Sequence, residues 1–143
     1  MRYAYPYTTE PESDGRLFIS FPDIPEALTD AEARAEAQRR AEDVLVTALS
    51  FYTDAGRPLP APSPARGRPV ALVPVLPALK LALHEAMLAR NVTNVALAKT
   101  LGTDEKSIRR MRDPLVPTKV ENLEAALRAL GRRAEVRVVE QAA

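Results

Sequence analysis

The amino-acid sequence predicts an α+β protein. We expect a small antiparallel sheet with one long helix at the N-terminus, followed by an all-α module that ends in a short strand. Three observations predict this fold. Residues 2–29 hold strand-like segments separated by turn formers, residues 31–54 are rich in helix formers, and residues 76–131 hold several short apolar stripes at helical spacing. The 143 residues are enough for one ordinary domain or two very small ones.

The first residues predict a hairpin. Residues 2–9 place Tyr3, Tyr5 and Tyr7 on one side, which is typical of a strand, and Pro6 favours a position at the edge of the sheet. Residues 10–15 are dense in turn formers and end in Asp-Gly, so residues 16–21 form the return strand. The segment 21–25, with two prolines, breaks that strand, and residues 26–29 can form a short third one.

A long helix is predicted from about residue 31 to residue 54, and Gly56 ends it. Its apolar stripe should pack on one face of the sheet, and the charged residues opposite form a solvated face. The stripe consists of Ala37, Ala41, Val44, Leu45, Ala48 and either Phe51 or Tyr52.

Five prolines make residues 57–69 a stiff, extended connector. Residues 70–73 then form a strand that can return to the N-terminal sheet as its last strand. The boundary between the modules is expected near residues 75–77, which divides the chain into residues 1–75 and 76–143.

Charge separates the two halves. Residues 1–65 hold 6 Lys and Arg against 11 Asp and Glu, a net charge of −5, whereas residues 66–143 hold 14 against 8, a net charge of +6. This asymmetry predicts different partners, and the basic half suits a phosphate backbone. The chain has no Cys and no long apolar run, so we expect a cytoplasmic protein that does not enter a membrane.

Residues 94–113 predict a helix-turn-helix. Thr93 or Asn94 caps a first helix, Gly102 stops it, and Asp104 and Glu105 favour the start of a second. The inward faces are Leu97, Ala98 and Leu101 on the first helix, and Ile108 and Met111 on the second. Two packed helices of any small domain would show part of this pattern. Arg109 and Arg110, on the outward face of the second helix, favour a unit that reads base edges in the major groove.

Two further helices are predicted in the second module, one before and one after this unit. Residues 76–89 form a helix with Leu79, Leu83, Ala86 and Met87 on one face. Thr118, with Glu121 three residues later, predicts a capping box for a last helix that Gly131 ends. The apolar stripe of this helix is Leu123, Ala126, Leu127 and Leu130.

Residues 134–140 alternate partly and predict a lone C-terminal strand. Pairing with the same strand of a second chain would satisfy its open edge, so we expect a homodimer or a higher even oligomer.

The chain resembles the HicB antitoxins of bacterial HicA–HicB toxin–antitoxin pairs, in the subgroup with a C-terminal helix-turn-helix. In the first half the resemblance is carried by the opening strand from Met1, the Asp14-Gly15 turn, residues 21–25, and residues 41–43 leading to residues 58–60. In the second half it is carried by residues 80–87, 97–102, 108–114 and 123–131. The chain departs from the family at Glu26-Ala27, where a Gly and a small residue are common, and at Ala33, where a Thr or Ser cap is usual.

The resemblance implies a degenerate ribonuclease H-like N-terminal domain that blocks a small HicA toxin, an RNase that acts on mRNA. It also implies a C-terminal domain that binds the operator of the pair's own operon. An acidic module suits a basic toxin, because opposite potentials steer association. We expect the toxin contacts at Glu10, Glu12, Asp14 and Asp23. The expected DNA contacts are Thr93, Asn94, Asp104, Glu105, Lys106, Ser107, Arg109 and Arg110.

Two other functions compete with this hypothesis. A nuclease would need clustered carboxylates that hold divalent metal, but the acidic residues on the predicted strands and turns fall in turn-rich stretches: Glu10, Glu12, Asp14 and Asp23. The single histidine, His84, is interpreted as a packing or surface residue, so we expect no catalytic residue, metal or cofactor. A stand-alone transcriptional regulator with a ligand-sensing N-terminal domain remains open.

Overall fold

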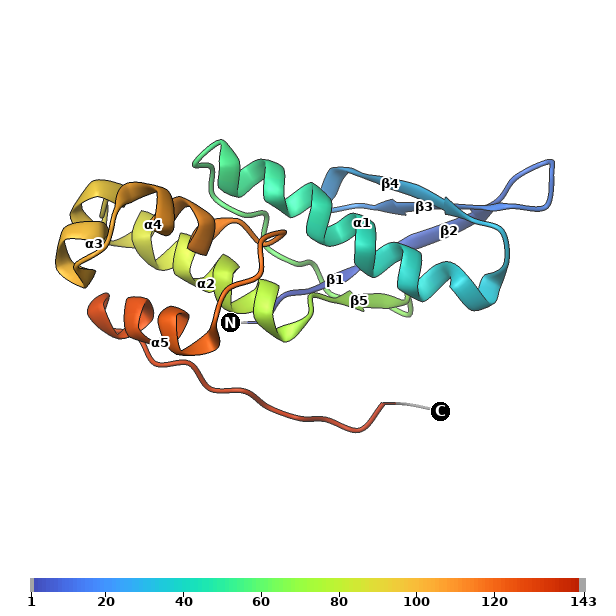
Figure 1. Cartoon of the computed structure of the whole chain (residues 1–143). Helices are drawn as coiled ribbons and strands as arrows, with labels where there is room; N and C mark the ends of the chain where they lie inside the picture. The colour runs from blue at the N-terminus through green and yellow to red at the C-terminus, as the bar shows by residue number, and fades with distance from the viewer. Residues whose placement is uncertain (1, 142–143) are drawn as a thin grey trace.

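The computed structural model describes residues 2–141 and confirms an α+β chain with a small antiparallel sheet at the N-terminus (Figure 1). Met1, where the opening strand was expected to begin, and residues 142–143 of the second module lie outside the described residues. The elements are, in order, β1 (Ala4–Pro6), β2 (Thr8–Pro11), β3 (Leu17–Phe21), β4 (Ile24–Ala31), α1 (Arg34–Asp54), β5 (Val70–Leu72), α2 (Val75–Ala89), α3 (Asn94–Leu101), α4 (Glu105–Arg112) and α5 (Val120–Ala129).

The first strand changes partner half-way. β1 pairs antiparallel with β5, whereas β2 pairs antiparallel with β3, which in turn pairs with β4. The prediction of one strand over residues 2–9 is therefore wrong, because Tyr7 interrupts the ladder and its N–H donates to the carbonyl of Pro69 at 2.9 Å. Pro6 closes the short β1, where a missing N–H costs little.

The third strand is longer than expected. β4 runs from Ile24 to Ala31, so the predicted break at residues 21–25 reduces to a turn at Pro22 and Asp23. Pro25 is tolerated because β4 is an edge strand of its sheet, where one side of the backbone needs no partner. Since Ala31 still belongs to β4, the long helix begins only at Arg34.

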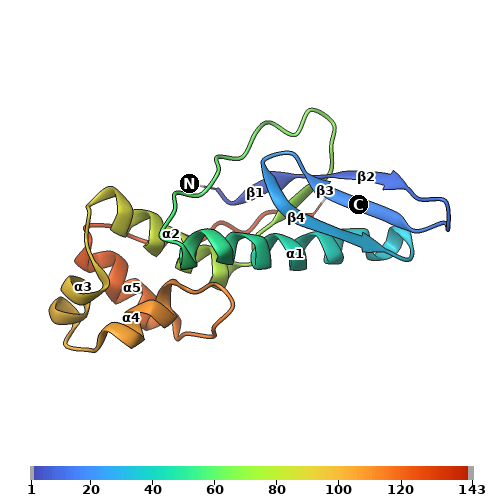
Figure 2. The same ribbon diagram turned by 90° about the horizontal axis from the view of Figure 1, so that it is seen from above.

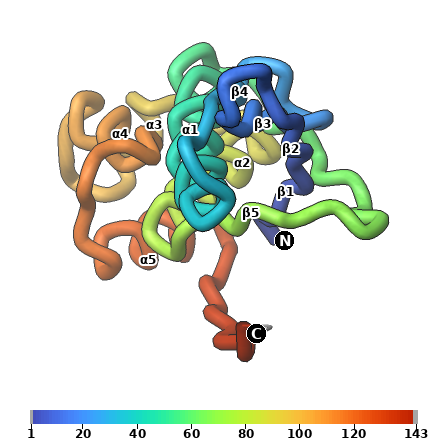
Figure 3. Tube along the Cα trace, turned by 90° about the vertical axis from the view of Figure 1, so that its right-hand side faces the viewer, coloured from blue at the N-terminus to red at the C-terminus, as the bar shows by residue number. Residues whose placement is uncertain are grey.

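Helix α1 packs along β3 and β4 and closes the core of the front lobe, which consists of β1–β5 and α1 (Figure 3). The predicted stripe is mostly confirmed, since Ala37, Ala41, Leu45 and Ala48 are buried. At its end Tyr52 is buried, whereas the Phe51 side chain is 54% exposed. All seven aromatic residues of the chain fall between Tyr3 and Tyr52.

The connector, residues 57–69, is extended as predicted and lies on the side of the strands away from α1 (Figure 2). Leu59 is buried, and the Tyr5 hydroxyl donates to the carbonyl of Pro60 at 2.7 Å. β5 then pairs with β1, which confirms that this segment returns to the first strand.

Helix α2 belongs to both hydrophobic cores. Ala78, Leu81 and Ala82 contact the front core, whereas Leu83 and Met87 contact the core of the back lobe, which consists of α3, α4 and α5. The back core contains only aliphatic residues and Met: Leu83, Ala86, Met87, Leu97, Ala98, Ile108, Leu123, Ala126, Leu127 and Leu130. A division of the chain at residues 75 and 76 stays a prediction, because α2 packs on both sides.

One prediction near the C-terminus is wrong, and another stays a prediction. Helix α5 begins at Val120 with Lys119 at the N-cap position, so Thr118 lies one residue too early and no side chain caps this helix. Residues 132–141 pair with no other segment of the described chain, so the pairing of residues 134–140 with a second chain stays a prediction.

None of the helices within residues 2–141 combines the length and the apolar character that crossing a bilayer requires.

Candidate nucleic-acid interface

A tight turn joins helices α3 and α4, and the capping residues of the two helices fix where each one begins or ends. The Thr93 Oγ1 accepts the N–H of Ala96 at 3.1 Å, which confirms Thr93 as the N-cap of α3. Gly102 ends α3 with a φ of 68°, a left-handed conformation that favours glycine. Asp104 then caps α4 by accepting the N–H of Ser107 at 2.7 Å. That hydrogen bond lowers the pKa of the Asp104 carboxyl, so the group stays charged at the positive end of α4.

The inner faces of these two helices meet as the spacing predicts. Leu97 and Ala98 on α3 and Ile108 on α4 are buried in the back core, and Leu101 and Met111 pack against it half-buried. Burial of this face leaves the opposite side of α4 to solvent.

That outer side is polar and mostly cationic. Lys106, Arg109 and Arg110 are exposed, as are Asp104 and Glu105, while Ser107 is half-buried. Arg109 donates to the Glu105 carboxylate at 2.6 Å, one turn earlier. Such an exposed pair is weak, so Arg109 can exchange it for another anion.

At the start of α3, Thr93 is exposed and Asn94 is half-buried. The Asn94 side-chain oxygen accepts from Arg112 Nη1 at 2.7 Å, which leaves its amide nitrogen as a donor. The structure thus gathers the predicted DNA contacts on α4 and on the start of α3.

A cleft of about 640 Å³ separates the end of α1 from α4. Arg109, Arg110 and Arg112 line it from α4, and Asp54 and Gly56 line it from the end of α1. A basic cleft beside an exposed cationic helix suits a strand of phosphates.

Three polar side chains that the sequence did not single out as functional lie behind this surface. Lys80 is fully buried, and its Nζ donates to the carbonyls of Arg110 and Asp113 at 2.9 and 3.1 Å, where α4 ends. His84 is fully buried too, with Nε2 at 2.8 Å from the Arg57 carbonyl and Nδ1 at 2.7 Å from Arg112 Nη2. The one available signal was the four-residue spacing of Lys80 and His84 within a helix that has only one other polar residue, Glu85.

The predicted toxin contacts do not form one cluster. Glu10 lies in β2, and Glu12 and Asp14 lie in the exposed turn that follows. Asp23 follows β3 at its opposite end and accepts both the N–H and the O–H of Ser63 at 2.9 Å. Asp23 therefore fastens the connector, whereas the other three carboxylates face solvent.

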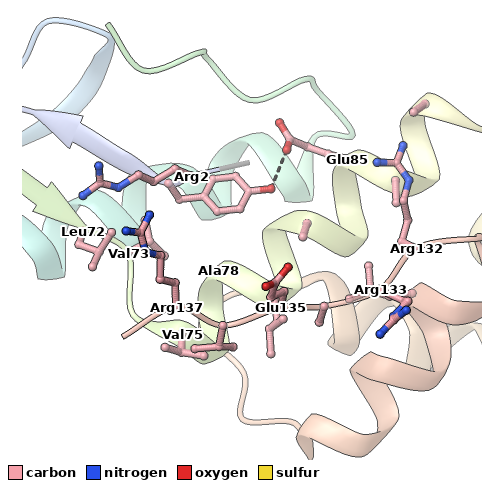
Figure 4. Close-up of a pocket in the computed structure, with 18 of the residues that line it drawn as sticks. Arg2, Leu72, Val73, Val75, Ala78, Glu85, Arg132, Arg133, Glu135 and Arg137 are labelled. Atoms are coloured by element: carbon pink, nitrogen blue, oxygen red, sulfur yellow. Dashed lines mark hydrogen bonds between the residues drawn. The ribbon is translucent and has the colours of Figure 1, made fainter. Parts of the chain in front are cut away.

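A second hollow runs between α2 and residues 132–139 (Figure 4). This groove has a volume of about 1450 Å³, and Leu72, Val73 and Val75 line it beside Arg132 and Arg137. At its wall the Tyr3 hydroxyl, just before β1, donates to the Glu85 carboxylate of α2 at 2.6 Å.

Comparison with known proteins decides the family. The sequence profile of the HicB-like antitoxins of bacterial toxin–antitoxin systems matches residues 4–82, more than half of the chain. The chain belongs to the HicB-like antitoxin family.

Individual members are similar over almost the full length. The chain is 39% identical to antitoxin HicB 2 of Photorhabdus laumondii over 132 residues, which cover 92% of this chain and 94% of that protein. It is 37% identical to antitoxin HicB of Escherichia coli K12 over 129 residues, covering 90% and 94%. With antitoxin HicB of Pseudomonas fluorescens the identity is 35% over 124 residues, covering 85% of each chain.

Membership of the HicB-like family agrees with a regulatory, non-enzymatic protein. Within residues 2–141, no group of three or more His, Asp or Glu side chains is placed to hold a metal ion. The profile ends within α2, and the relatives extend the similarity well beyond it into the back lobe.

Proposed function

We propose that this HicB-like antitoxin neutralises a HicA-type, mRNA-cleaving toxin with residues 1–75 and represses its own operon by binding operator DNA with residues 76–143. The observation that carries the proposal is the exposed cationic face of α4, with Lys106, Arg109 and Arg110, on a helix whose inner face is buried. Membership of the HicB-like antitoxin family supports a toxin as the partner of this chain.

For DNA, we propose that α3 and α4 act as a helix-turn-helix with α4 in the major groove. Residues near the start of such a second helix reach base edges, which assigns Glu105, Lys106, Arg109 and Arg110 to that role. The start of α3 presents the exposed Thr93 and the free amide donor of Asn94, both suited to a phosphate. The net charge of +6 over residues 66–143 supports backbone contact.

For the toxin, the front lobe is the candidate partner surface, as a degenerate ribonuclease H-like domain that binds rather than cleaves. Glu10 at the end of β2 and Glu12 and Asp14 in the turn to β3 are exposed, and the net charge of residues 1–65 is −5. A protein that binds RNA presents a basic surface, so opposite charge would speed the encounter. Asp23 would contribute indirectly, by holding the connector in place.

The DNA assignment is tested with Arg109→Ala combined with Arg110→Ala. The probe is a duplex of the sequence immediately upstream of the antitoxin's own operon, measured in a salt series. Loss of a base-reading arginine costs about 1–3 kcal/mol, and loss of a phosphate contact lowers the salt slope by about one. Arg34→Ala combined with Arg39→Ala, exposed on α1, is the matched control. Unchanged binding by the α4 variant would refute the groove assignment.

The toxin assignment is tested by co-expression with the product of the adjacent gene, followed by gel filtration. Reversing the charge at Glu10, Glu12 and Asp14 to Lys should slow association and lower the yield of the complex. Glu121→Lys combined with Glu124→Lys, exposed on α5, is the control and should leave capture intact. Capture that survives the first set and fails with the second would place the toxin on the back lobe.

A dimer or a higher even oligomer is part of the proposal, since helix-turn-helix proteins bind half-sites about 34 Å apart. Residues 134–140 have the strand-like pattern but no partner strand within the described chain, and Val138 is 92% exposed. Pairing of this segment with its copy in a second chain would give the open backbone N–H and C=O groups of both segments hydrogen-bond partners. Truncation after Arg133 should yield a monomer by light scattering, and an intact dimer would refute this pairing.

A further inference from the structure

Lys80, His84 and Arg112 bridge α2 and α4 where the front and back lobes meet. Arg112 donates from Nη1 to Asn94 at the start of α3 and from Nη2 to His84 on α2. Lys80, one turn before His84, satisfies two carbonyls at the end of α4. Helices α2, α3 and α4 are thus tied together by polar contacts that are largely removed from water.

The same contacts reach the front lobe through Arg57, the first connector residue after α1. Its carbonyl meets His84 Nε2 at 2.8 Å, and its guanidinium lies 4.5 Å above the ring of Tyr52. Tyr52 in turn donates to the Glu26 carboxylate of β4 at 2.7 Å. A continuous series of contacts therefore runs from β4 to Asn94.

The protonation state of His84 follows from its neighbours. A guanidinium only donates, so Nδ1 must be the acceptor for Arg112, and the ring proton sits on Nε2 and is donated to Arg57. A second proton on Nδ1 would set an N–H against the guanidinium and place two cations in contact. Burial lowers the pKa of His84, and Arg112 lowers it further, while the hydrogen bond to the Arg57 carbonyl opposes part of this shift.

The charged groups near the ring offer the added proton no counter-ion. Arg112 comes from α4, Arg57 from the connector, and Lys80 lies one turn earlier in α2. Glu85, the next residue, directs its carboxylate to Tyr3, and Asp54 of α1 borders the cleft that Arg112 also lines.

We infer that Lys80, His84 and Arg112 form a polar bracket that positions α4 and the start of α3 on the front lobe, and that one proton on His84 opens it. The DNA-binding consequence rests on the proposed function. These three are positioning residues, because they hold the candidate DNA contacts in place from behind. Opening the bracket separates Arg112 from His84 and frees Asn94 to move.

The bracket itself is tested without DNA. His84 is the only histidine of the chain, so its ring gives a single set of imidazole nuclear magnetic resonance signals in the full-length protein. We expect the Nε2–H tautomer at neutral pH and a titration midpoint below the ordinary histidine value of about 6.5. A ring protonated on Nδ1, or one that titrates at the ordinary value, would overturn the inference.

The positioning role is tested with operator affinity from about pH 7.5 down to about pH 5, across the range in which imidazole titrates. Wild-type affinity should fall about tenfold, the scale of one lost hydrogen bond to a charged group. His84→Gln can donate and accept like the neutral ring but cannot gain a proton, so its profile should stay flat. Arg112→Met should bind about tenfold more weakly already at neutral pH.

The outcomes separate the two proposals. If His84→Gln loses affinity in acid as the wild type does, the bracket does not control binding. If the wild type binds no DNA at any pH, the proposed function fails, whereas the tautomer and midpoint of His84 still decide whether the bracket exists.

Discussion

The front and back lobes hold their helices in different ways. In the front lobe, four buried tyrosines fill the core, and each hydroxyl donates to a partner: Glu85, the Pro60 carbonyl, Gln38 and Glu26. The back lobe has no Phe, Tyr or Trp, and aliphatic side chains and Met87 fill its core. Aromatic rings pack in preferred geometries, whereas a core of aliphatic side chains depends mainly on total volume and defines one arrangement less strictly. We therefore expect the orientation of α4 to depend on the polar contacts of Lys80, His84 and Arg112.

The largest effect should come from emptying either core. Ile19 in the front lobe and Ile108 in the back lobe are both 0% exposed, so replacing either with Ala should lower the free energy of unfolding by about 2–5 kcal/mol. Hydrogen exchange should show lost protection mainly in the lobe that carries the change. Equal loss of protection in both lobes after either change would show that they unfold as one unit.

The next effect concerns Lys80. In Lys80→Met, the carbonyls of Arg110 and Asp113 lose the donor they share, at a cost of about 1–3 kcal/mol in urea unfolding at neutral pH. A stability equal to the wild type would show that packing alone holds the end of α4.

The cost of Lys80→Met should also depend on pH. Burial lowers the pKa of Lys80 from 10.5 to about 8, so between these values the folded protein binds fewer protons than the unfolded chain. Wild-type stability relative to Lys80→Met should therefore rise as the pH goes from about 8 to 10.5, because the buried cation loses its charge. A difference that stays constant in urea titrations over that range would contradict this reasoning.

A smaller effect is expected from one tyrosine hydroxyl. Tyr5→Phe leaves the ring in place but removes the donor to the Pro60 carbonyl, which should lower the free energy of unfolding by about 0.5–1.5 kcal/mol. Phe51→Leu, at an exposed ring, is the control and should change stability by about 0.5 kcal/mol or less. Similar losses in the two variants would mean that the hydroxyl contacts do not distinguish the front lobe.

The smallest effect tests a cap that the sequence predicted correctly against one that it did not. Thr93→Ala removes the side-chain cap of α3 and should lower stability by about 0.5–1 kcal/mol, since the site is exposed. Thr118→Ala should change nothing measurable by thermal unfolding, because Thr118 caps no helix. A larger loss at Thr118 than at Thr93 would reverse the assignment of the caps.

The features that could be predicted from the sequence are those that depend on a few neighbouring residues. Thr93, Gly102 and Asp104 set the ends of α3 and α4 through their own side chains or backbone, so spacing along the chain was enough. The inner face of the two helices followed from periodicity for the same reason.

Features that depend on distant partners could not be predicted. Arg112 and His84 are 28 residues apart, and Lys80 meets a carbonyl 33 residues away, so no local pattern joins them. The prediction that Thr118 caps α5 was wrong because the chain stays extended through Lys119 before α5 begins. Residues 134–140 alternate like a strand, yet a strand also needs a neighbour, which composition does not supply.

The confinement of every Phe and Tyr to residues 3–52 has a consequence for optical work on this chain. With no tryptophan present, ultraviolet absorbance and intrinsic fluorescence come almost entirely from tyrosine and therefore follow the sheet and α1. Unfolding of the helices beyond α2 would therefore leave the tyrosine absorbance and fluorescence almost unchanged. A tryptophan placed at the exposed Val95 would give that half its own optical reporter.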